Sequence, residues 1–164
     1  MGAAGIDRVE SDRTQIPIEE LLLQRHEMLL LECLHDYGPT HVEVGARVTQ
    51  NHPLVDRSRG MPAWVGVELM AQAVSVFSAL ELRARGLPPR IGLLLGARSF
   101  ETRVPYFCVG ASLNVRATLT LRDRTGLGVF ECTIHEQGAL LARAQVKGYM
   151  PEDIDAFLRS SENG

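Results

Sequence analysis

A single carboxylate interrupts the longest apolar run of the chain. Residues 61–80 read MPAWVGVELMAQAVSVFSAL, and Glu68 is the only charged residue among them. Val67 and Leu69 flank it, and apolar surroundings favour the protonated form of a carboxyl group, which could then deliver a proton. Gln72 follows one helical turn later, where it could orient Glu68 or serve helix packing. Glu68 is therefore the leading candidate for a general acid or a water-positioning group. The alternative is a carboxylate that points to solvent or pairs with an arginine.

Histidine exchanges protons near neutral pH, so the five histidines are the candidates for a base to accompany Glu68. His52 precedes the apolar run, in the segment NHPLVD, and Pro53 favours an extended backbone there. We expect His52 to be the base, the alternative being a turn histidine with no role. The other four have no metal-ligand spacing and are expected to serve packing or to face the surface. They are His26, His35, His41 and His135.

The element that carries Glu68 is expected to be a helix over residues 61–80. Pro62 suits a first helical turn, and Arg83, Arg85 and Gly86 supply a cationic last turn and a stop. A run of this length could also span a bilayer. A carboxylate near the middle of such a span costs about 2.5–3.5 kcal/mol, and the segments downstream need an apolar partner. A buried core helix is therefore the preferred interpretation.

The elements around this helix follow the strand period of two. A short helix is expected at residues 16–22, before the first strand. Six strands are expected, at residues 28–34, 42–48, 91–100, 113–121, 129–135 and 141–149, with a tight turn at 136–138. Long antiparallel strands curled around one helix bury the apolar faces of both. The sequence thus predicts an α+β fold, a single hot-dog domain in which a curved antiparallel sheet wraps a long central helix.

Composition places the chain among ordinary globular proteins. It has 164 residues, enough for one domain at 15–155, with a disordered leader at 1–14 and a tail at 156–164. The net charge of −3 gives no basic field for nucleic acid or a membrane surface. The leader has no signal-peptide pattern, so a cytoplasmic location is expected. The three cysteines are expected to be small buried side chains in a reducing compartment. They are Cys33, Cys108 and Cys132.

Three segments in register resemble bacterial 3-hydroxyacyl-[acyl-carrier-protein] dehydratases. The first is MPA at 61–63 with ELMAQ at 68–72, similar to the family's MPG…ExMAQ helix. The second is LGARSF at 95–100, followed by Val-Pro and Val-Gly pairs, and the third is RHEMLLL at 25–31. The resemblance runs from about Ile16 to Pro151. Details such as PAWVGVELMAQ look closest to a divergent branch, the dehydratases of aryl-polyene pathways.

This resemblance implies a reaction and roles for particular residues. The reaction is dehydration of a 3-hydroxyacyl thioester on acyl carrier protein to a trans-2-enoyl thioester. Glu68 matches the family's catalytic Asp or Glu, and the amide of Ala63 matches a glycine amide that binds the thioester oxygen. The family's Gly-His-Phe-Pro loop is missing, which leaves His52 as the histidine nearest to its position. Candidates for the acyl tunnel are Trp64, Met70, Leu93 and Leu94.

The resemblance also implies how the protein works with partners. No cofactor and no metal are expected. Acyl carrier protein is acidic, so arginines near the site could steer it, namely Arg57, Arg59, Arg98 or Arg103. A homodimer is expected, with sheets side by side and with histidine and carboxylate from different subunits, or a hetero-assembly with another hot-dog dehydratase. Because the histidine loop is missing, a catalytically impaired partner subunit that binds acyl chains is the alternative, and an acyl thioesterase is a third hypothesis.

Overall fold

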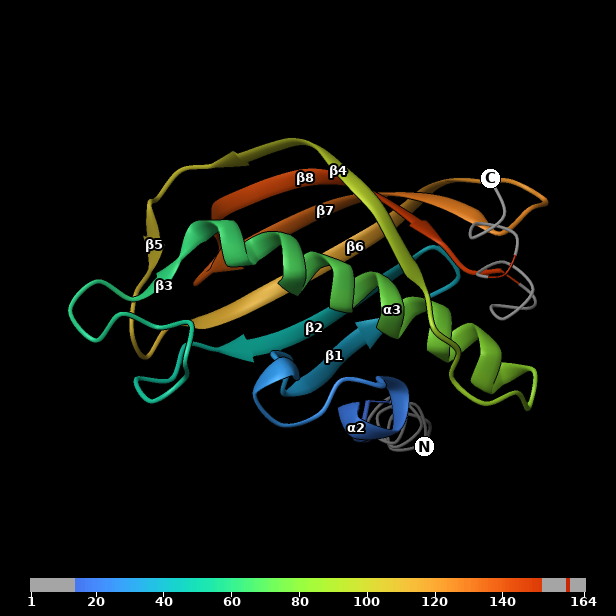
Figure 1. The fold of residues 1–164 in the computed structure, drawn as a ribbon, viewed down its shortest axis with the longest axis horizontal. Helices are drawn as coiled ribbons and strands as arrows, with labels where there is room; N and C mark the ends of the chain where they lie inside the picture. The colour runs from blue at the N-terminus through green and yellow to red at the C-terminus, as the bar shows by residue number, and fades with distance from the viewer. Residues whose placement is uncertain (1–13, 152–158, 160–164) are drawn as a thin grey trace, which may run out of the picture.

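One helix, α3 (Gly66–Ala84), lies against the concave face of a six-stranded antiparallel sheet (Figure 1). The computed structural model describes residues 14–151 and 159. Within them the strand order is β1-β2-β6-β7-β8-β4, and a separate pair, β3-β5, lies beside the start of the helix. The predicted α+β hot-dog architecture, a sheet wrapped around one helix, is confirmed.

The sheet is built mainly from neighbouring antiparallel strands. A register of residues 114–122 against 128–135 joins β6 to β7, and a tight turn at Gln137 and Gly138 joins β7 to β8. Both turn residues have positive φ, 48° and 82°, as a two-residue hairpin turn requires. The strands are β1 (Cys33–Tyr37), β2 (His41–Arg47), β4 (Leu93–Thr102), β6 (Ser112–Arg122), β7 (Leu127–Glu136) and β8 (Ala139–Tyr149).

Strict alternation in β2 makes one face of the sheet apolar. Val42, Val44 and Ala46 are buried, and they face the helix side together with Val115 and Ala117 of β6. Helix α3 also has a buried apolar face, which includes its side chains at positions 69, 70, 73, 76, 77 and 80. Burying the apolar side of each element against the other is the main source of stability for such a fold.

The end of α3 follows the sequence signals. The amide of Gly86 donates to the carbonyl of Arg83, and the amide of Leu87 donates to that of Leu82. With Gly86 at φ +69°, these two bonds form a Schellman motif that satisfies the last carbonyls. This helix is long and apolar enough to cross a membrane by length and composition, but two thirds of its apolar window, 67%, is buried inside the fold. It is a core helix here.

The beginning of the helix differs from the prediction. Met61 and Pro62 form strand β3, which pairs with β5 (Tyr106–Phe107), and a 3-10 turn, η2 (Ala63–Val65), then leads into α3. Pro62 has ψ 134°, so it is extended and not the first helical residue. The fixed φ of proline allows both conformations, and pairing with β5 decides between them.

The expected strand at 28–34 is also wrong in part. His26–Met28 forms a 3-10 turn, η1, and the first strand is β1, five residues later than its expected start. Leu30 and Leu31 are buried as an apolar run should be, but the amide of Leu30 donates to the side chain of Gln72 and not to a neighbouring strand. Burial was predicted correctly, whereas the hydrogen-bond partner, a single side chain, leaves no periodic pattern.

The expectations for the short first helix and for the cysteines are confirmed in part. The short helix α2 is Ile18–Leu21, within the expected range. Cys132 is buried, and burial raises the pKa of its thiol to about 12, but Cys33 and Cys108 are exposed, contrary to prediction. They lie at the start of β1 and just after β5, where the chain leaves the core. The expected leader at 1–14 and tail at 156–164 fall almost wholly outside the described residues.

Strand β4 lies at one edge of the sheet and crosses over α3 (Figure 1). Its inner neighbour is β8, and its other edge is unpaired within the described residues. Most of its side chains are exposed, including Leu94 and Leu95, and Ile91 just before it is exposed as well. A long, apolar, unpaired edge invites pairing with another strand.

Candidate active site

Glu68 lies in the first turn of α3 and is half-buried. The side chain of Gln72, one turn later, donates from Nε2 to Glu68 Oε1 at 2.8 Å. This bond occupies one carboxyl oxygen and leaves Oε2 as the atom that can carry a transferable proton. The predicted neighbourhood of Glu68 and Gln72 on one face of the helix is therefore seen in the structure.

Gln72 is the only buried polar or charged side chain among the described residues, with an exposure of 0%. Besides its bond to Glu68, its Nε2 donates to the carbonyl of Met28 at 2.7 Å, and its Oε1 accepts from the amide of Leu30 at 3.0 Å. The amide group thus ties the helix to the segment 28–30, and its three bonds fix its own orientation. Glu68 is held by a side chain that cannot turn away.

His52 lies in the loop between β2 and β3, and both of its ring nitrogens are engaged. Its Nδ1 accepts from the amide of Leu54 at 3.1 Å, which places the proton on Nε2. Nε2 in turn faces the carbonyl of Glu27 at 2.9 Å. His52 therefore holds the segment next to the one that Gln72 binds. A lone pair for proton abstraction becomes available only if one of these bonds opens.

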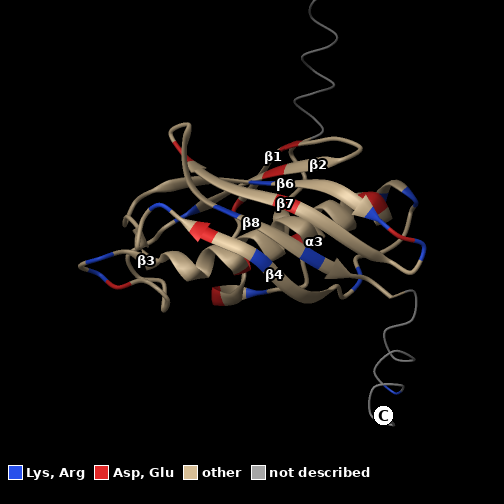
Figure 2. Ribbon diagram, turned by 90° about the horizontal axis from the view of Figure 1, so that it is seen from above, with Lys and Arg blue, Asp and Glu red and all other residues tan. Residues whose placement is uncertain are grey.

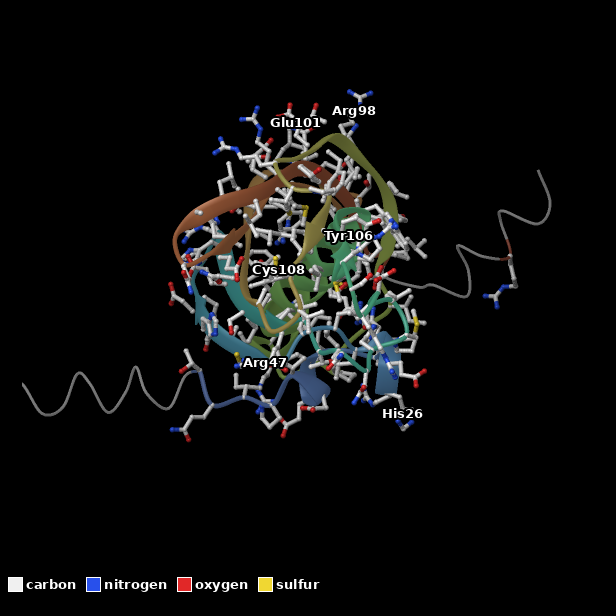
Figure 3. The ribbon with its side chains drawn as sticks, turned by 90° about the vertical axis from the view of Figure 1, so that its left-hand side faces the viewer. His26, Arg47, Arg98, Glu101, Tyr106 and Cys108 are labelled. Atoms are coloured by element: carbon white, nitrogen blue, oxygen red, sulfur yellow. The ribbon has the colours of Figure 1, made fainter. Side chains whose placement is uncertain are left out.

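The backbone N–H of Ala63 is already hydrogen-bonded, unlike the free N–H groups in the first turn of a helix. It donates to the carbonyl of Pro105 at 3.0 Å, across the small β3-β5 pair. The amide is paired because the residues before Ala63 are extended and pair with β5; it could bind a thioester oxygen, as the resemblance implies, only if this bond opened. Figure 3 looks onto this end of the molecule, where Tyr106 and Cys108 lie over the middle and His26 lies at the rim.

A groove of about 430 Å³ begins at Glu68 and follows the outer stripe of α3. Along the helix its lining repeats every three or four residues, at Glu68, Ala71, Ser75, Ser78 and Leu82. The opposite wall comes from the start of β4, the start of β7 and the end of β8. The candidate acid and the outer stripe of the helix thus line one groove.

Two of the four candidates for the acyl tunnel line the groove, and the other two do not. Leu93 and Leu94 line the groove opposite the helix. Met70 is fully buried in the core, on the sheet side of α3, and Trp64 is 63% exposed; neither lines the groove. The sequence could not tell these two pairs apart, because all four are apolar residues near the same helix.

The far end of the groove is rich in arginine, which the sequence reasoning missed. Arg122 at the end of β6 binds Glu81 of α3 through two bonds, at 2.8 and 2.7 Å, and its guanidinium lies 5.7 Å from the ring centre of Phe77. Figure 2 shows basic and acidic residues alternating in the turn after β6. The arginines that line this end are Arg85, Arg90, Arg122 and Arg124.

The remaining candidates lie away from the groove. Cys33 and His35 contact each other on the outer side of β1, and His41 pairs with Asp36 at 3.0 Å, which lowers the pKa of that carboxyl. Arg59 bonds Tyr106, and the other proposed steering arginines are exposed; none of them lines the groove. Those arginines are Arg57, Arg98 and Arg103. No group of His, Cys, Asp and Glu among the described residues could hold a metal ion.

A curved antiparallel sheet wrapped around one long helix, with a groove along that helix, is the layout of a hot-dog fold. Residues 16–159 match the ApeP-like family, described as ApeP dehydratase, so the chain belongs to that family. The predicted resemblance to a dehydratase-like hot-dog family, closest to its aryl-polyene branch, is thereby confirmed.

Solved structures support the same grouping. The dehydratase heterocomplex ApeI:P from Xenorhabdus doucetiae contains a chain with 28% identity and a TM-score of 0.80, over 87% of this chain and 96% of that one. The PaaI protein of E. coli, from the phenylacetic acid degradation operon, has 16% identity and a TM-score of 0.55, over 71% and 81%. A hypothetical thioesterase of Streptococcus pneumoniae with coenzyme A has 16% identity, a TM-score of 0.55 and coverage of 71% and 82%. The last two show the fold alone. No curated protein sequence matches the chain.

Proposed function

We propose that this chain dehydrates a 3-hydroxyacyl thioester, carried on acyl carrier protein, to a trans-2-enoyl thioester within an aryl-polyene pathway. The observation that carries the proposal is the Glu68–Gln72 pair at the head of the groove. Membership of the ApeP-like dehydratase family supports the reaction type. The aryl-polyene assignment rests on the same membership and on the similarity to the ApeI:P heterocomplex.

The reaction needs a proton removed from the α-carbon and a hydroxyl group expelled from the β-carbon. A base takes the α-proton, the electron pair forms the α,β double bond, and the β-hydroxyl leaves with the proton of Glu68 as water. Gln72 occupies Oε1, so the delivered proton resides on Oε2. Water then restores the proton to Glu68 as the base returns its own to solvent.

The base is supplied, in this proposal, by a second hot-dog subunit. His52 is tied to Glu27 and Leu54, and the chain has no Gly-His-Phe-Pro loop. The edge of β4 that is unpaired within the described residues offers a place for a partner strand beside the groove, and the similar chain of known structure comes from a dehydratase heterocomplex. A composite site would combine Glu68 of this chain with a histidine of the partner.

The test is a dehydration assay on purified protein. A 3-hydroxyacyl-carrier protein is incubated with this chain alone, with a second hot-dog dehydratase from the same source alone, and with both; loss of one water is followed by mass. We expect turnover with both and little with this chain alone. Glu68→Gln should abolish the gain, and His52→Ala should keep it. If the mixture is active but Glu68→Gln is as active as wild type, the proposed role of Glu68 fails.

One observation favours a second function, a partner subunit without a catalytic group. Both nitrogens of the histidine nearest to the family's catalytic position are already bonded. In that case the second dehydratase would turn over substrate by itself, and this chain would raise its stability or affinity with Glu68→Gln as effective as wild type. Release of a free acid, which a thioesterase would give, is not expected from either function.

A further inference from the structure

The outer face of the sheet carries a cysteine and a histidine in direct contact, away from Glu68. Cys33 and His35 project from β1, which forms the edge of the sheet opposite to β4 (Figure 1). Both are exposed, and Cys33 Sγ lies 3.1 Å from His35 Nε2. We propose that this pair is a reactive thiol site, at which Cys33 exchanges with low-molecular-weight disulfides and becomes reversibly capped as a mixed disulfide. The site is independent of the proposed dehydration.

A β-bulge in β1 sets the position of His35. The register between β1 and β2 shifts between Leu34 and Asp36, so His35 is an extra residue without a partner on β2. Bulges re-aim side chains relative to the regular pleat of a strand. Leu34 is buried on the helix side, whereas Cys33 and His35, on either side of it, are exposed on the outer face. The bulge thus brings an imidazole to a thiol on the same face of the strand.

Gly45 of β2 provides the space in which the two side chains meet. It pairs with Cys33, and a Cβ built on it would lie 2.6 Å from Cys33 Sγ and 2.8 Å from His35 Nε2. Packed side chains do not approach each other this closely, so a larger residue here would displace both the thiol and the imidazole. Position 45 faces away from the helix, in alternation with Val44 and Ala46, and yet Gly45 is buried. The thiol and the ring therefore cover it.

A buried acceptor without a partner lies beside the pair. Asn114 of β6 is the neighbour of Gly45 on its other side, and the Cβ positions of such cross-strand neighbours are about 4.5–5.5 Å apart. Its Nδ2 donates to Glu43 at 3.3 Å, whereas its Oδ1 is buried and has no hydrogen-bond partner among the described residues. When Nε2 of His35 accepts the thiol proton, the ring already carries a proton on Nδ1. Asn114 Oδ1 accepts from this second N–H and orients the ring.

The exchange requires only these groups and the disulfide itself. His35 Nε2 takes the proton of the Cys33 thiol, and the thiolate attacks one sulfur of the disulfide. A bond forms between Cys33 Sγ and that sulfur, the sulfur–sulfur bond of the reagent breaks, and the second sulfur leaves as a thiolate. The leaving thiolate takes the proton from the His35 imidazolium and departs as a thiol. Cys33 is thereby oxidised, and the departing half of the reagent is reduced.

The charged residues that flank the pair on the outer face are engaged with one another. Each acid among them has a basic partner on the same strand or on a neighbouring one. The pairs are Glu32–Arg47, Asp36–His41 and Glu43–Arg116. The ionisable group in direct contact with the Cys33 thiol is therefore His35.

The other two cysteines provide internal comparisons. Cys132 is buried, and burial raises the pKa of its thiol to about 12, so we expect it not to react with a disulfide in solution. Cys108 is exposed just after β5, and no histidine bonds its thiol among the described residues. Exposure is thus common to Cys33 and Cys108, and the adjacent imidazole distinguishes them.

The test measures the rate of thiol–disulfide exchange in the whole chain. 4,4′-Dithiodipyridine is the disulfide, release of thiopyridone is followed by absorbance, and the modified cysteine is identified by peptide mass. Cys108→Ser keeps Cys33 as an exposed thiol, and Cys33→Ser keeps Cys108. We expect Cys33 to react about tenfold faster near neutral pH, because the imidazole takes the proton of the thiol. Equal rates for the two thiols, or a slower Cys33, would overturn the proposal.

The role of His35 is tested in the Cys108→Ser background. His35→Ala should lower the rate to about that of Cys108, and added imidazole should restore part of it, because free imidazole can replace a base but not a packing contact. His41→Ala is the matched control, since His41 also lies on the outer face and bonds Asp36. Equal rates for His35→Ala and His41→Ala would overturn the assignment of the base, as would a loss that imidazole does not restore.

Gly45 and Asn114 are tested in the same background, with melting temperatures to confirm folding. Gly45→Ala displaces the thiol from the imidazole and should slow the reaction of Cys33. Asn114→Leu removes the acceptor and should slow it several-fold, whereas Asn114→Asp keeps an acceptor oxygen and should retain the rate. Unchanged rates in Gly45→Ala would contradict the need for contact between the two side chains. Equal rates in the two Asn114 variants would overturn the positioning role of Asn114.

Discussion

The two ends of the groove are built differently. At the Glu68 end, a fully buried amide, Gln72, makes three hydrogen bonds and orients the carboxyl group. At the other end, exposed arginines extend from a helix terminus and a turn, and the pair Arg122–Glu81 lies at the surface. Chemistry needs atoms fixed within fractions of an ångström, whereas attraction of a charged group tolerates movement. Substitutions at the Glu68 end should therefore lower kcat, whereas substitutions at the arginine end should raise KM.

The largest effect is expected for Glu68→Gln. Glutamine keeps the size of the side chain and can still meet Gln72, but it cannot deliver a proton to a leaving hydroxyl group. Loss of a general acid lowers kcat by about 10²–10⁴-fold, with little change in KM or melting temperature. The measurement is steady-state dehydration by the active assembly. Glu81→Gln at the arginine end is the matched control, and a similar fall in its kcat would contradict the comparison.

Gln72→Met should lower both the stability of the protein and the rate of dehydration. Methionine fills a similar volume but leaves the amide of Leu30 and the carbonyl of Met28 without partners. Each unsatisfied group costs about 1–3 kcal/mol, so we expect the two to lower the free energy of unfolding by about 2–6 kcal/mol. Urea unfolding measures it. Ser75→Ala, which removes only a hydroxyl group on the groove side of α3, should change stability by less than about 1 kcal/mol.

Sequence reasoning found the buried end more readily than the exposed one. Glu68 stands out because it is the only charge in a long apolar run, and Gln72 follows at the spacing of one turn. The sheet and the core helix follow from periods of two and of three to four. By contrast, Arg122 and Arg85 are far apart in sequence, and only the fold brings both to one end of the groove.

The contacts near the site that the sequence did not predict have one physical cause. The amide of Ala63 bonds Pro105, the amide of Leu30 bonds Gln72, and His52 bonds the carbonyl of Glu27. Each is a contact between segments distant in sequence, made by one backbone group. Hydrophobic period predicts which side chains are buried but not which partner an isolated amide or carbonyl finds. The spacing of Ala71, Ser75 and Ser78 from Glu68 was the available signal for the groove.

At the arginine end, added salt should change KM and leave kcat nearly unchanged. Raising ionic strength shortens the range of attraction between exposed charges, to about 10 Å at 0.1 M salt and about 3 Å at 1 M. We expect KM for a carrier-bound substrate to rise several-fold over this range while kcat stays nearly constant. The variant Arg85→Gln/Arg124→Gln should show a higher KM at low salt and a flatter salt dependence. A salt-dependent kcat with constant KM would contradict the division of labour between the two ends.

The smallest effect is expected for His52→Ala, and it tests where the base resides. His52 is part of an exposed loop, and its ring bridges Glu27 and Leu54, so its loss should cost no more than about 1 kcal/mol in the free energy of unfolding. In the assembly with a second hot-dog subunit, kcat should stay within about twofold of wild type, whereas loss of a true base would lower it by about 10²–10⁴-fold. A fall of that size, with an unchanged melting temperature, would return the base to this chain and require the bond to Glu27 to open during turnover.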